Sequence, residues 1–94
     1  MPRRNDEIDA DWAAFAQELA VSLRRARDQR GMSQEEVAYR AGLTRYTYQK
    51  YEKGESRPGT PSNPTLRSML ALSQVLGVAL ADLIPSGIPD LRTR

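Results

Sequence analysis

Five polar side chains share one face of a predicted helix and together have the chemistry of a nucleic-acid contact surface. They recur at three- and four-residue steps, which places them on one side of the helix: Arg45, Tyr46, Gln49, Lys50 and Lys53. An arginine can donate to both O6 and N7 of a guanine, a contact that contributes about 1–3 kcal/mol of discrimination. Arg45 is therefore the first candidate for a base contact. Lys50 and Tyr46 could each contact either a base or a phosphate.

The composition argues against most other chemistry. The 94 residues include no cysteine and no histidine, which removes disulfides, thiolate metal sites and the commonest general base. An enzyme would depend on carboxylates, lysine, arginine or hydroxyl groups, and no such groups are visibly paired for catalysis. We therefore expect one domain without enzymatic activity, cofactor or metal. Nothing in the sequence indicates a small-molecule site.

The positive charge is concentrated around the candidate surface. Residues 1–19 include two basic and five acidic residues, whereas residues 20–67 include ten basic and five acidic ones. A phosphate-binding surface requires such an asymmetry, although a solvated basic face would also produce it. No apolar run approaches the length of a membrane span, and the acidic start is unlike a signal peptide. We expect a soluble, cytoplasmic protein without a membrane partner.

Two helices joined by a tight turn are expected to position the contact surface. Apolar residues at helical spacing predict a long first helix over residues 9–30, which Gly31 ends. Ser33 and Glu36 match a capping box at the start of the second helix, and Gly42 ends that helix. The third helix then begins after Thr44. This layout lets one helix enter the major groove while the other braces it.

The remaining chain is expected to complete an all-helical core. Residues 55–64 are rich in proline, glycine and serine and predict a loop, with no β-strand pattern anywhere. Thr65 caps a fourth helix, and residues 79–84 form a short fifth one. The expected core stripe of the fourth helix includes Leu66, Met69, Leu70, Ser73 and Leu76.

The sequence resembles the Cro/C1-type (XRE family) helix-turn-helix. The resemblance rests on SQEEVAYRAGLT followed by YTYQKYEKGE, and on LSQVLGVALADLI, which is similar to the family's closing helices. It implies an all-α, five-helix bundle of the lambda-repressor-like type, here with an extended first helix and the helix-turn-helix at residues 33–54. The domain would span residues 9–85, between a flexible segment at 1–8 and a tail at 86–94. The implied activity is binding of double-stranded operator DNA by a bacterial or phage transcriptional regulator, most often a repressor.

The resemblance also implies roles for individual residues. Arg45, Tyr46 and Lys50 align with the family's base-reading positions, and Gln49 flanks them. Gln34, at the first position of the second helix, binds the DNA backbone in the family, and its amide together with the free N–H groups of the helix start fits a phosphate. Further candidates for backbone contacts complete the predicted site: Thr44, Lys53 and Arg57.

A second set of family positions is structural. The family often pairs an arginine late in the first helix with a glutamate at the end of the third, here Arg27 and Glu52. Such a pair would fix the third helix and would not contact DNA. Tyr48 departs from the family pattern, which has a small branched residue at this position. We expect its hydroxyl to need a partner and the third helix to lie slightly farther from the core.

Trp12 and Phe15 lie outside the family's minimal domain, and exposing both would be costly. They could cover the end of the fifth helix or meet a second subunit, and Ile88 and Leu91 of the tail pose the same question. We favour a homodimer that binds two half-sites. The alternatives are an antitoxin-like module whose protein partner covers the Trp12 and Phe15 face, and a nonspecific nucleic-acid binder.

Overall fold

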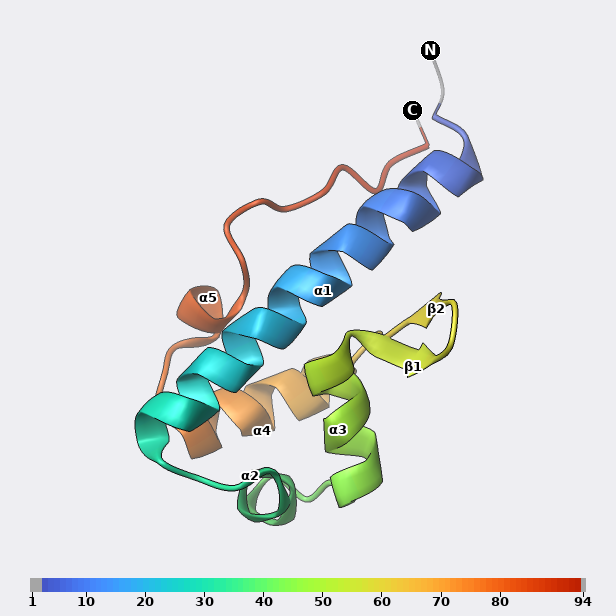
Figure 1. Cartoon of the computed structure of the whole chain (residues 1–94). Helices are drawn as coiled ribbons and strands as arrows, with labels where there is room; N and C mark the ends of the chain where they lie inside the picture. Colours follow the sequence, from blue (N-terminus) through green and yellow to red (C-terminus); the bar gives the residue numbers. More distant parts are fainter. Residues whose placement is uncertain (1–2, 94) are drawn as a thin grey trace.

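The first helix is long, and the other elements lie along it (Figure 1). The computed structural model describes residues 3–93. Its elements are α1 (Asn5–Arg30), α2 (Gln34–Arg40), α3 (Arg45–Lys53), β1 (Glu55–Arg57), β2 (Thr60–Pro61), α4 (Leu66–Leu76) and α5 (Leu80–Leu83). The expected all-α fold class with five helices is confirmed, and a small hairpin accompanies the helices.

Hydroxyl side chains cap three of the helices at the positions that the sequence indicates. The side-chain oxygens of Ser33, Thr44 and Thr65 each accept a hydrogen bond of 3.0 Å from the backbone N–H three residues later. Each bond satisfies an N–H group that has no partner within its helix. These caps fix where α2, α3 and α4 begin.

The turn between α2 and α3 depends on Gly42. Its φ of 73° lies in the left-handed region, which costs glycine little. The Gly42 N–H donates to the Tyr39 carbonyl at 3.2 Å, and the Leu43 N–H donates to the Ala38 carbonyl at 2.9 Å. These bonds close the end of α2 and turn the chain directly into α3.

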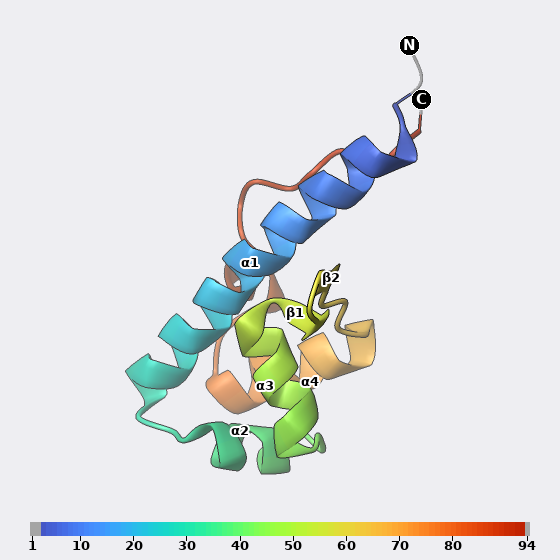
Figure 2. The ribbon, with the colours of Figure 1, turned by 45° about the vertical axis from the view of Figure 1, so that its right-hand side comes forward.

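Helix α1 begins at Asn5, four residues before the expected start, so that residues 5–8 are helical. Asp6 and Glu7 in its first turn suit the positive end of the helix dipole. Arg3 ties this end to the tail, because its backbone N–H donates to the Thr93 carbonyl at 2.7 Å and its guanidinium bonds the Asp90 carbonyl. In both ribbon views, the tail after α5 runs beside α1 toward the start of that helix (Figure 2).

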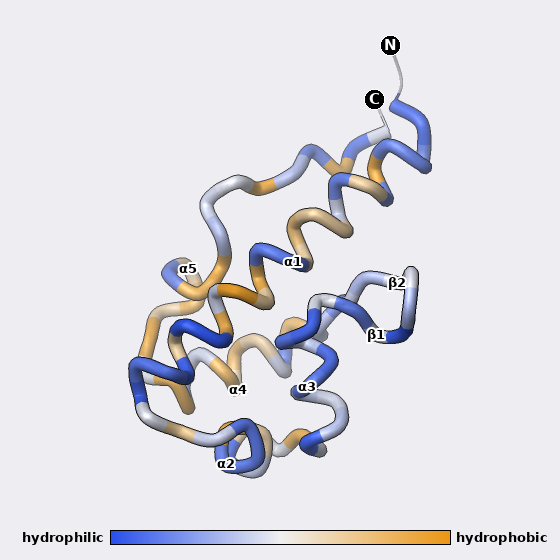
Figure 3. Tube along the Cα trace, in the orientation of Figure 1, coloured by the Kyte–Doolittle hydropathy of each residue, from blue (hydrophilic) through white to orange (hydrophobic). Residues whose placement is uncertain are grey.

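The core forms where all five helices meet, and its buried side chains include Leu19, Leu23, Val37, Tyr48, Leu72, Leu76 and Leu83. The hydropathy colouring shows apolar stretches along α4 and, alternating with hydrophilic ones, along α1 (Figure 3). One expectation for α4 is wrong, because Leu66 and Leu70 are exposed and Leu72 is buried instead. Leucines at positions 66, 70, 72 and 76 give α4 two overlapping helical stripes, and helical period alone does not choose between them.

The expected loop at residues 55–64 contains a β-hairpin, so the prediction of no strand is wrong. Glu55 pairs with Pro61, and Arg57 pairs with Thr60, in antiparallel register. The sequence Pro58–Gly59 links the strands, and Gly59 has a φ of 81°. Proline followed by a glycine with positive φ suits a type II turn, so the same residues that interrupt helices here favour a hairpin.

The segment after the hairpin contacts Trp12, one of two neighbouring aromatic residues on α1. The Trp12 indole N–H donates to the Ser62 carbonyl at 3.2 Å, and the Trp12 and Phe15 rings lie 5.6 Å apart. Phe15 is only 6% exposed. It therefore has little surface left for a second subunit.

Candidate nucleic-acid interface

The predicted contact residues lie on the outer side of α3, opposite Tyr48, which is fully buried. Arg45, Tyr46 and Lys53 are exposed, while Gln49 and Lys50 are half-buried. Thr44 is exposed at the N-terminal end of the helix. The row of side chains expected from the sequence is thus accessible along the whole length of α3.

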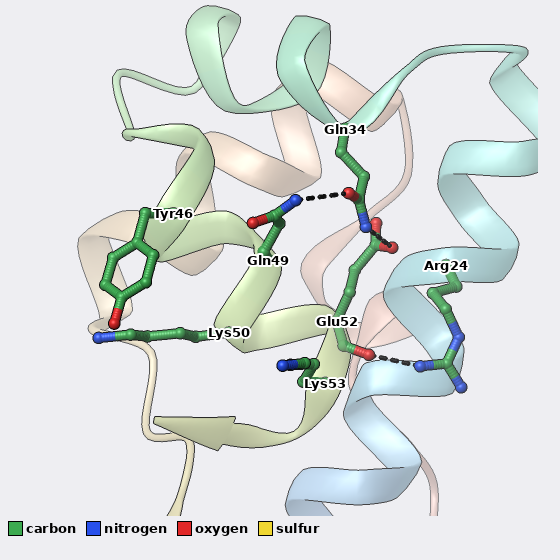
Figure 4. A pocket seen from close by; sticks show the side chains of 7 residues that line it. All are labelled: Arg24, Gln34, Tyr46, Gln49, Lys50, Glu52 and Lys53. Carbon is green, nitrogen blue, oxygen red and sulfur yellow. Dashed lines mark hydrogen bonds between the residues drawn. The ribbon is translucent and has the colours of Figure 1, made fainter. Parts of the chain in front are cut away.

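A groove of about 420 Å³ lies between this row and the neighbouring helices (Figure 4). Its lining comes from α1, the start of α2 and α3: Arg24, Gln34, Tyr46, Gln49, Lys50, Glu52 and Lys53. Three of these side chains are positively charged, and the single acidic one is held in an ion pair. The groove therefore presents mainly hydrogen-bond donors, as a surface for phosphates and base edges requires.

Glu52 is the buried anchor of the groove, with 3% of the residue exposed. The Arg27 Nε donates to Glu52 Oε2 at 2.6 Å, and Arg27 Nη2 donates to Oε1 at 3.0 Å. Arg27 Nη1 also donates to the Met32 carbonyl at 3.0 Å. One guanidinium thus joins α1, the connection before α2, and α3. The structure brings the two predicted partners together as a two-bond ion pair.

The electrostatics of this pair keep Glu52 charged. Burial by itself would raise the pKa of the Glu52 carboxyl, but the Arg27 guanidinium, the nearby Tyr48 hydroxyl and the Gln34 amide outweigh it and leave that pKa below its ordinary value. The Tyr48 hydroxyl lies near this carboxylate and makes no hydrogen bond to the residues described. Burial, and then the interaction of the hydroxyl with the Glu52 carboxylate, raise the pKa of Tyr48 well above its ordinary value. Tyr48 therefore stays neutral beside the Glu52 carboxylate.

Gln34 is held within the protein. Its Nε2 donates to Glu52 Oε1 at 2.9 Å, and its Oε1 accepts from Gln49 Nε2 at 3.3 Å. The amide keeps one hydrogen that is not used in these bonds. The phosphate contact expected of the Gln34 side chain is thus limited to that single donor.

Lys50 and Tyr46 lie against each other at the edge of the groove. The Lys50 Nζ is 4.2 Å from the centre of the Tyr46 ring, a cation–π contact one helical turn apart (Figure 4). This contact holds the ammonium beside an exposed aromatic face. Arg45 lies apart from the groove, in a hollow of about 280 Å³ that it shares with Glu35 and Tyr39 of α2.

Arg57 and the hairpin lie beside the same end of α3. A hollow of about 200 Å³ separates them, lined by Tyr46, Lys50 and Lys53 on one side and by residues 55–58 on the other. The Arg57 Nε donates to Thr60 Oγ1 at 3.4 Å, across the strand pair. The hairpin therefore presents its arginine next to the basic end of the helix.

Two residues of this surface were missed by the sequence analysis. Arg24 lines the groove, and its guanidinium donates to the Glu52 backbone carbonyl. Its position three residues before Arg27 places both on one face of α1, and this spacing could have identified it. Tyr39 on α2 is 83% exposed beside Arg45, and no periodic signal distinguishes it from an ordinary surface tyrosine.

A family model described as a helix-turn-helix domain matches residues 18–83, which include α2, the Gly42 turn and α3. The chain belongs to the helix-turn-helix domain family. Comparisons with curated proteins and with solved structures found no match. The helix-turn-helix is a DNA-binding motif, and α3 is its second helix in this chain. Within residues 3–93, no helix is long and apolar enough to cross a membrane.

Proposed function

We propose that this helix-turn-helix protein is a Cro/C1-type transcriptional regulator that recognises a specific operator and represses by occupying it. The observation that carries the proposal is the accessible row of Arg45, Tyr46, Gln49 and Lys50 on a helix anchored by the buried Arg27–Glu52 pair. A rigidly held helix with a chemically mixed outer face can distinguish bases, whereas a uniformly basic one binds phosphates alike. We assign the base contacts to these four residues and place the protein in the cytoplasm of a bacterium or of a phage host.

Contacts to the DNA backbone would surround this row. Thr44 lies at the N-terminal end of α3 and Lys53 at the other, and Arg57 extends the basic surface along the hairpin. Gln34 contributes its one remaining amide hydrogen. Such contacts fix the register of the protein on the duplex without reading its sequence.

The regulator would bind as a homodimer over two half-sites. Ile88 and Leu91 of the tail are 66% and 47% exposed, and a second copy is the occupant that two-fold operator binding requires. Trp12 borders a hollow with Leu91 and can join this surface. The antitoxin-like alternative depended on an open Trp12 and Phe15 face, and the burial of Phe15 reduces its support.

Selection of bound sequences from a random DNA pool tests the proposal. We expect an enriched site with two half-sites about 10 base pairs apart. Arg45→Ala should relax the preference at one base pair per half-site, whereas Arg57→Ala should weaken binding to all sequences and lower the salt slope by about one. The matched control is Arg25→Ala, which removes the same charge from α1 beside α5. Equal affinity of the wild type for selected and random DNA would contradict a sequence-specific function.

A further inference from the structure

In the groove, Gln49 donates a hydrogen bond to Gln34, and Gln34 donates one to Glu52. The Glu52 carboxylate determines which group of each amide is the donor. Arg27 supplies two of the donors to this carboxylate, and the carboxyl stays ionised because its pKa is lowered. An ionised carboxylate can only accept hydrogen bonds. Every neighbour that bonds Glu52 must therefore present a donor to it.

The need for a donor to Glu52 fixes the orientation of two amide side chains, those of Gln34 and Gln49. Gln34 must turn its NH₂ group to Glu52, which it does at 2.9 Å, so its carbonyl oxygen faces Gln49. Gln49 must then turn its own NH₂ group to that oxygen, at 3.3 Å. The orientation of both amides follows from the chemistry of their partners, since an amide turned the other way would set oxygen against oxygen.

The chain of bonds ends with the Gln49 carbonyl. The Gln49 oxygen points away from Gln34, on the side of the groove where Tyr46 and Lys50 lie (Figure 4). Within residues 3–93, no group donates a hydrogen bond to it. Lys50, Lys53 and Arg24 around the groove carry only donors on their side chains, so this oxygen is an acceptor with a fixed direction on a surface of donors.

We propose that Gln49 reads an exocyclic amino group in the major groove, adenine N6 or cytosine N4, through its carbonyl oxygen, with Gln34 and Glu52 as positioning residues. Guanine O6 and thymine O4 are acceptors at the corresponding places and would oppose the Gln49 oxygen. The row on α3 thus combines a donor for guanine at Arg45 with an acceptor for amino-bearing bases at Gln49. The inference rests on the proposed sequence-specific function.

The test removes one amino group at a time from the selected DNA site. Each adenine is replaced by purine, or each cytosine by 2-pyrimidinone, and dissociation constants are measured for the wild type and for Gln49→Met. At one base per half-site, loss of the amino group should weaken wild-type binding about three- to tenfold. The same loss should change the affinity of Gln49→Met less than about twofold. Comparison of the two proteins cancels the effect of the altered base on the duplex itself.

A further variant separates reading from positioning. Gln34→Met removes the bond that orients Gln49, so it should reduce the discrimination at this base while leaving the Arg45-dependent base pair unchanged. Thermal unfolding of Gln34→Met verifies that the variant is folded during the measurement.

The outcomes distinguish this inference from the function on which it rests. A wild-type selection that enriches no sequence overturns the proposed function. An enriched site whose amino groups matter equally to the wild type and to Gln49→Met overturns the role of Gln49. Undiminished discrimination by Gln34→Met overturns the positioning role alone.

Discussion

Arg27 donates two hydrogen bonds to the Glu52 carboxylate, of 2.6 and 3.0 Å, and thereby joins α1 to the C-terminal turn of α3. The side chains of the pair are 17% and 2% exposed. Breaking a buried pair by removing one charge leaves the other without compensation. The groove on α3 therefore depends on a contact that lies behind it.

We expect Glu52→Gln to lower the free energy of unfolding by about 3–5 kcal/mol, because Arg27 would keep its charge without its buried partner. Only the exposed Asp28 would remain as an anionic neighbour, at 3.7 Å. Urea denaturation of both proteins measures the difference. The matched control is Glu36→Gln, which breaks the exposed Glu36–Arg40 ion pair of 2.8 Å and should cost less than about 1 kcal/mol. Equal losses in the two variants would contradict an anchoring role for the buried pair.

The same carboxylate predicts a pH dependence. Burial would raise the pKa of Glu52, but the interactions with Arg27, Tyr48 and Gln34 dominate and lower it. A carboxyl whose pKa is lower in the folded state stabilises the fold above its unfolded pKa, about 4.3, and this contribution is lost as the pH falls through the folded value. The unfolding free energy of the wild type should therefore drop on acidification below about pH 5. Unfolding measured from pH 3 to 7 should give a flatter curve for Glu52→Gln.

Asp90 also has a lowered pKa, so it contributes to the pH dependence of both the wild type and Glu52→Gln. The side-chain and backbone hydrogen bonds of Arg92 lower the pKa of Asp90 to about 2. Asp90 is exposed and remains in Glu52→Gln, so the difference between the two curves isolates Glu52. Superimposable curves after vertical shifting would contradict a lowered pKa at Glu52.

The positions of the caps and of the turn could be predicted because their causes are local. Ser33, Thr44 and Thr65 each bond a backbone N–H three residues away, and Gly42 supplies the left-handed residue of the turn. Such interactions involve neighbouring residues, so the sequence displays all of their participants. The helix boundaries around the contact surface follow from them.

The sequence-based predictions were wrong where contacts between distant segments determine burial or strand pairing. Leu70 and Leu72 lie in the same helix and have similar side chains, and only the packing of α4 on the core buries Leu72. The hairpin needs Glu55 to pair with Pro61 across the Pro58–Gly59 turn, and composition alone treats this stretch as a loop. Composition and period do not contain these relationships.

Most residues of the groove, although not Arg24, could be predicted from the sequence, but the hydrogen bonds between them could not. The outer row on α3 follows from three- and four-residue spacing. The bonds from Gln34 to Glu52 and from Gln49 to Gln34 join positions 18 and 15 residues apart, and only the folded arrangement sets the orientation of these amides. The direction of hydrogen bonding, on which base preference depends, is therefore a property of the tertiary structure.

Tyr48→Phe should leave stability unchanged or increase the free energy of unfolding by about 1 kcal/mol. The Tyr48 hydroxyl is buried and makes no hydrogen bond of ordinary geometry among residues 3–93. Its removal therefore ends the cost of burying a polar group and loses only its electrostatic interaction with the nearby Glu52 carboxylate. Urea denaturation tests this, with Tyr46→Phe as the control, because Tyr46 is 68% exposed and should respond little. Destabilisation of Tyr48→Phe by more than about 1 kcal/mol would instead mean that the hydroxyl bonds a partner.

Ile88→Glu should dissociate the proposed homodimer, since a carboxylate in an apolar interface loses its hydration without gaining a partner. Ile88 lies on the tail that runs beside α1 (Figure 1), away from the core, so the monomer should keep its stability. Leu66→Glu is the matched control, because Leu66 on α4 is 68% exposed and Ile88 is 66% exposed. Sedimentation measurements over a range of protein concentrations should give a dimer for Leu66→Glu and a monomer for Ile88→Glu. The opposite result would move the interface to α4, and a wild type that is monomeric even on operator DNA would contradict dimeric binding.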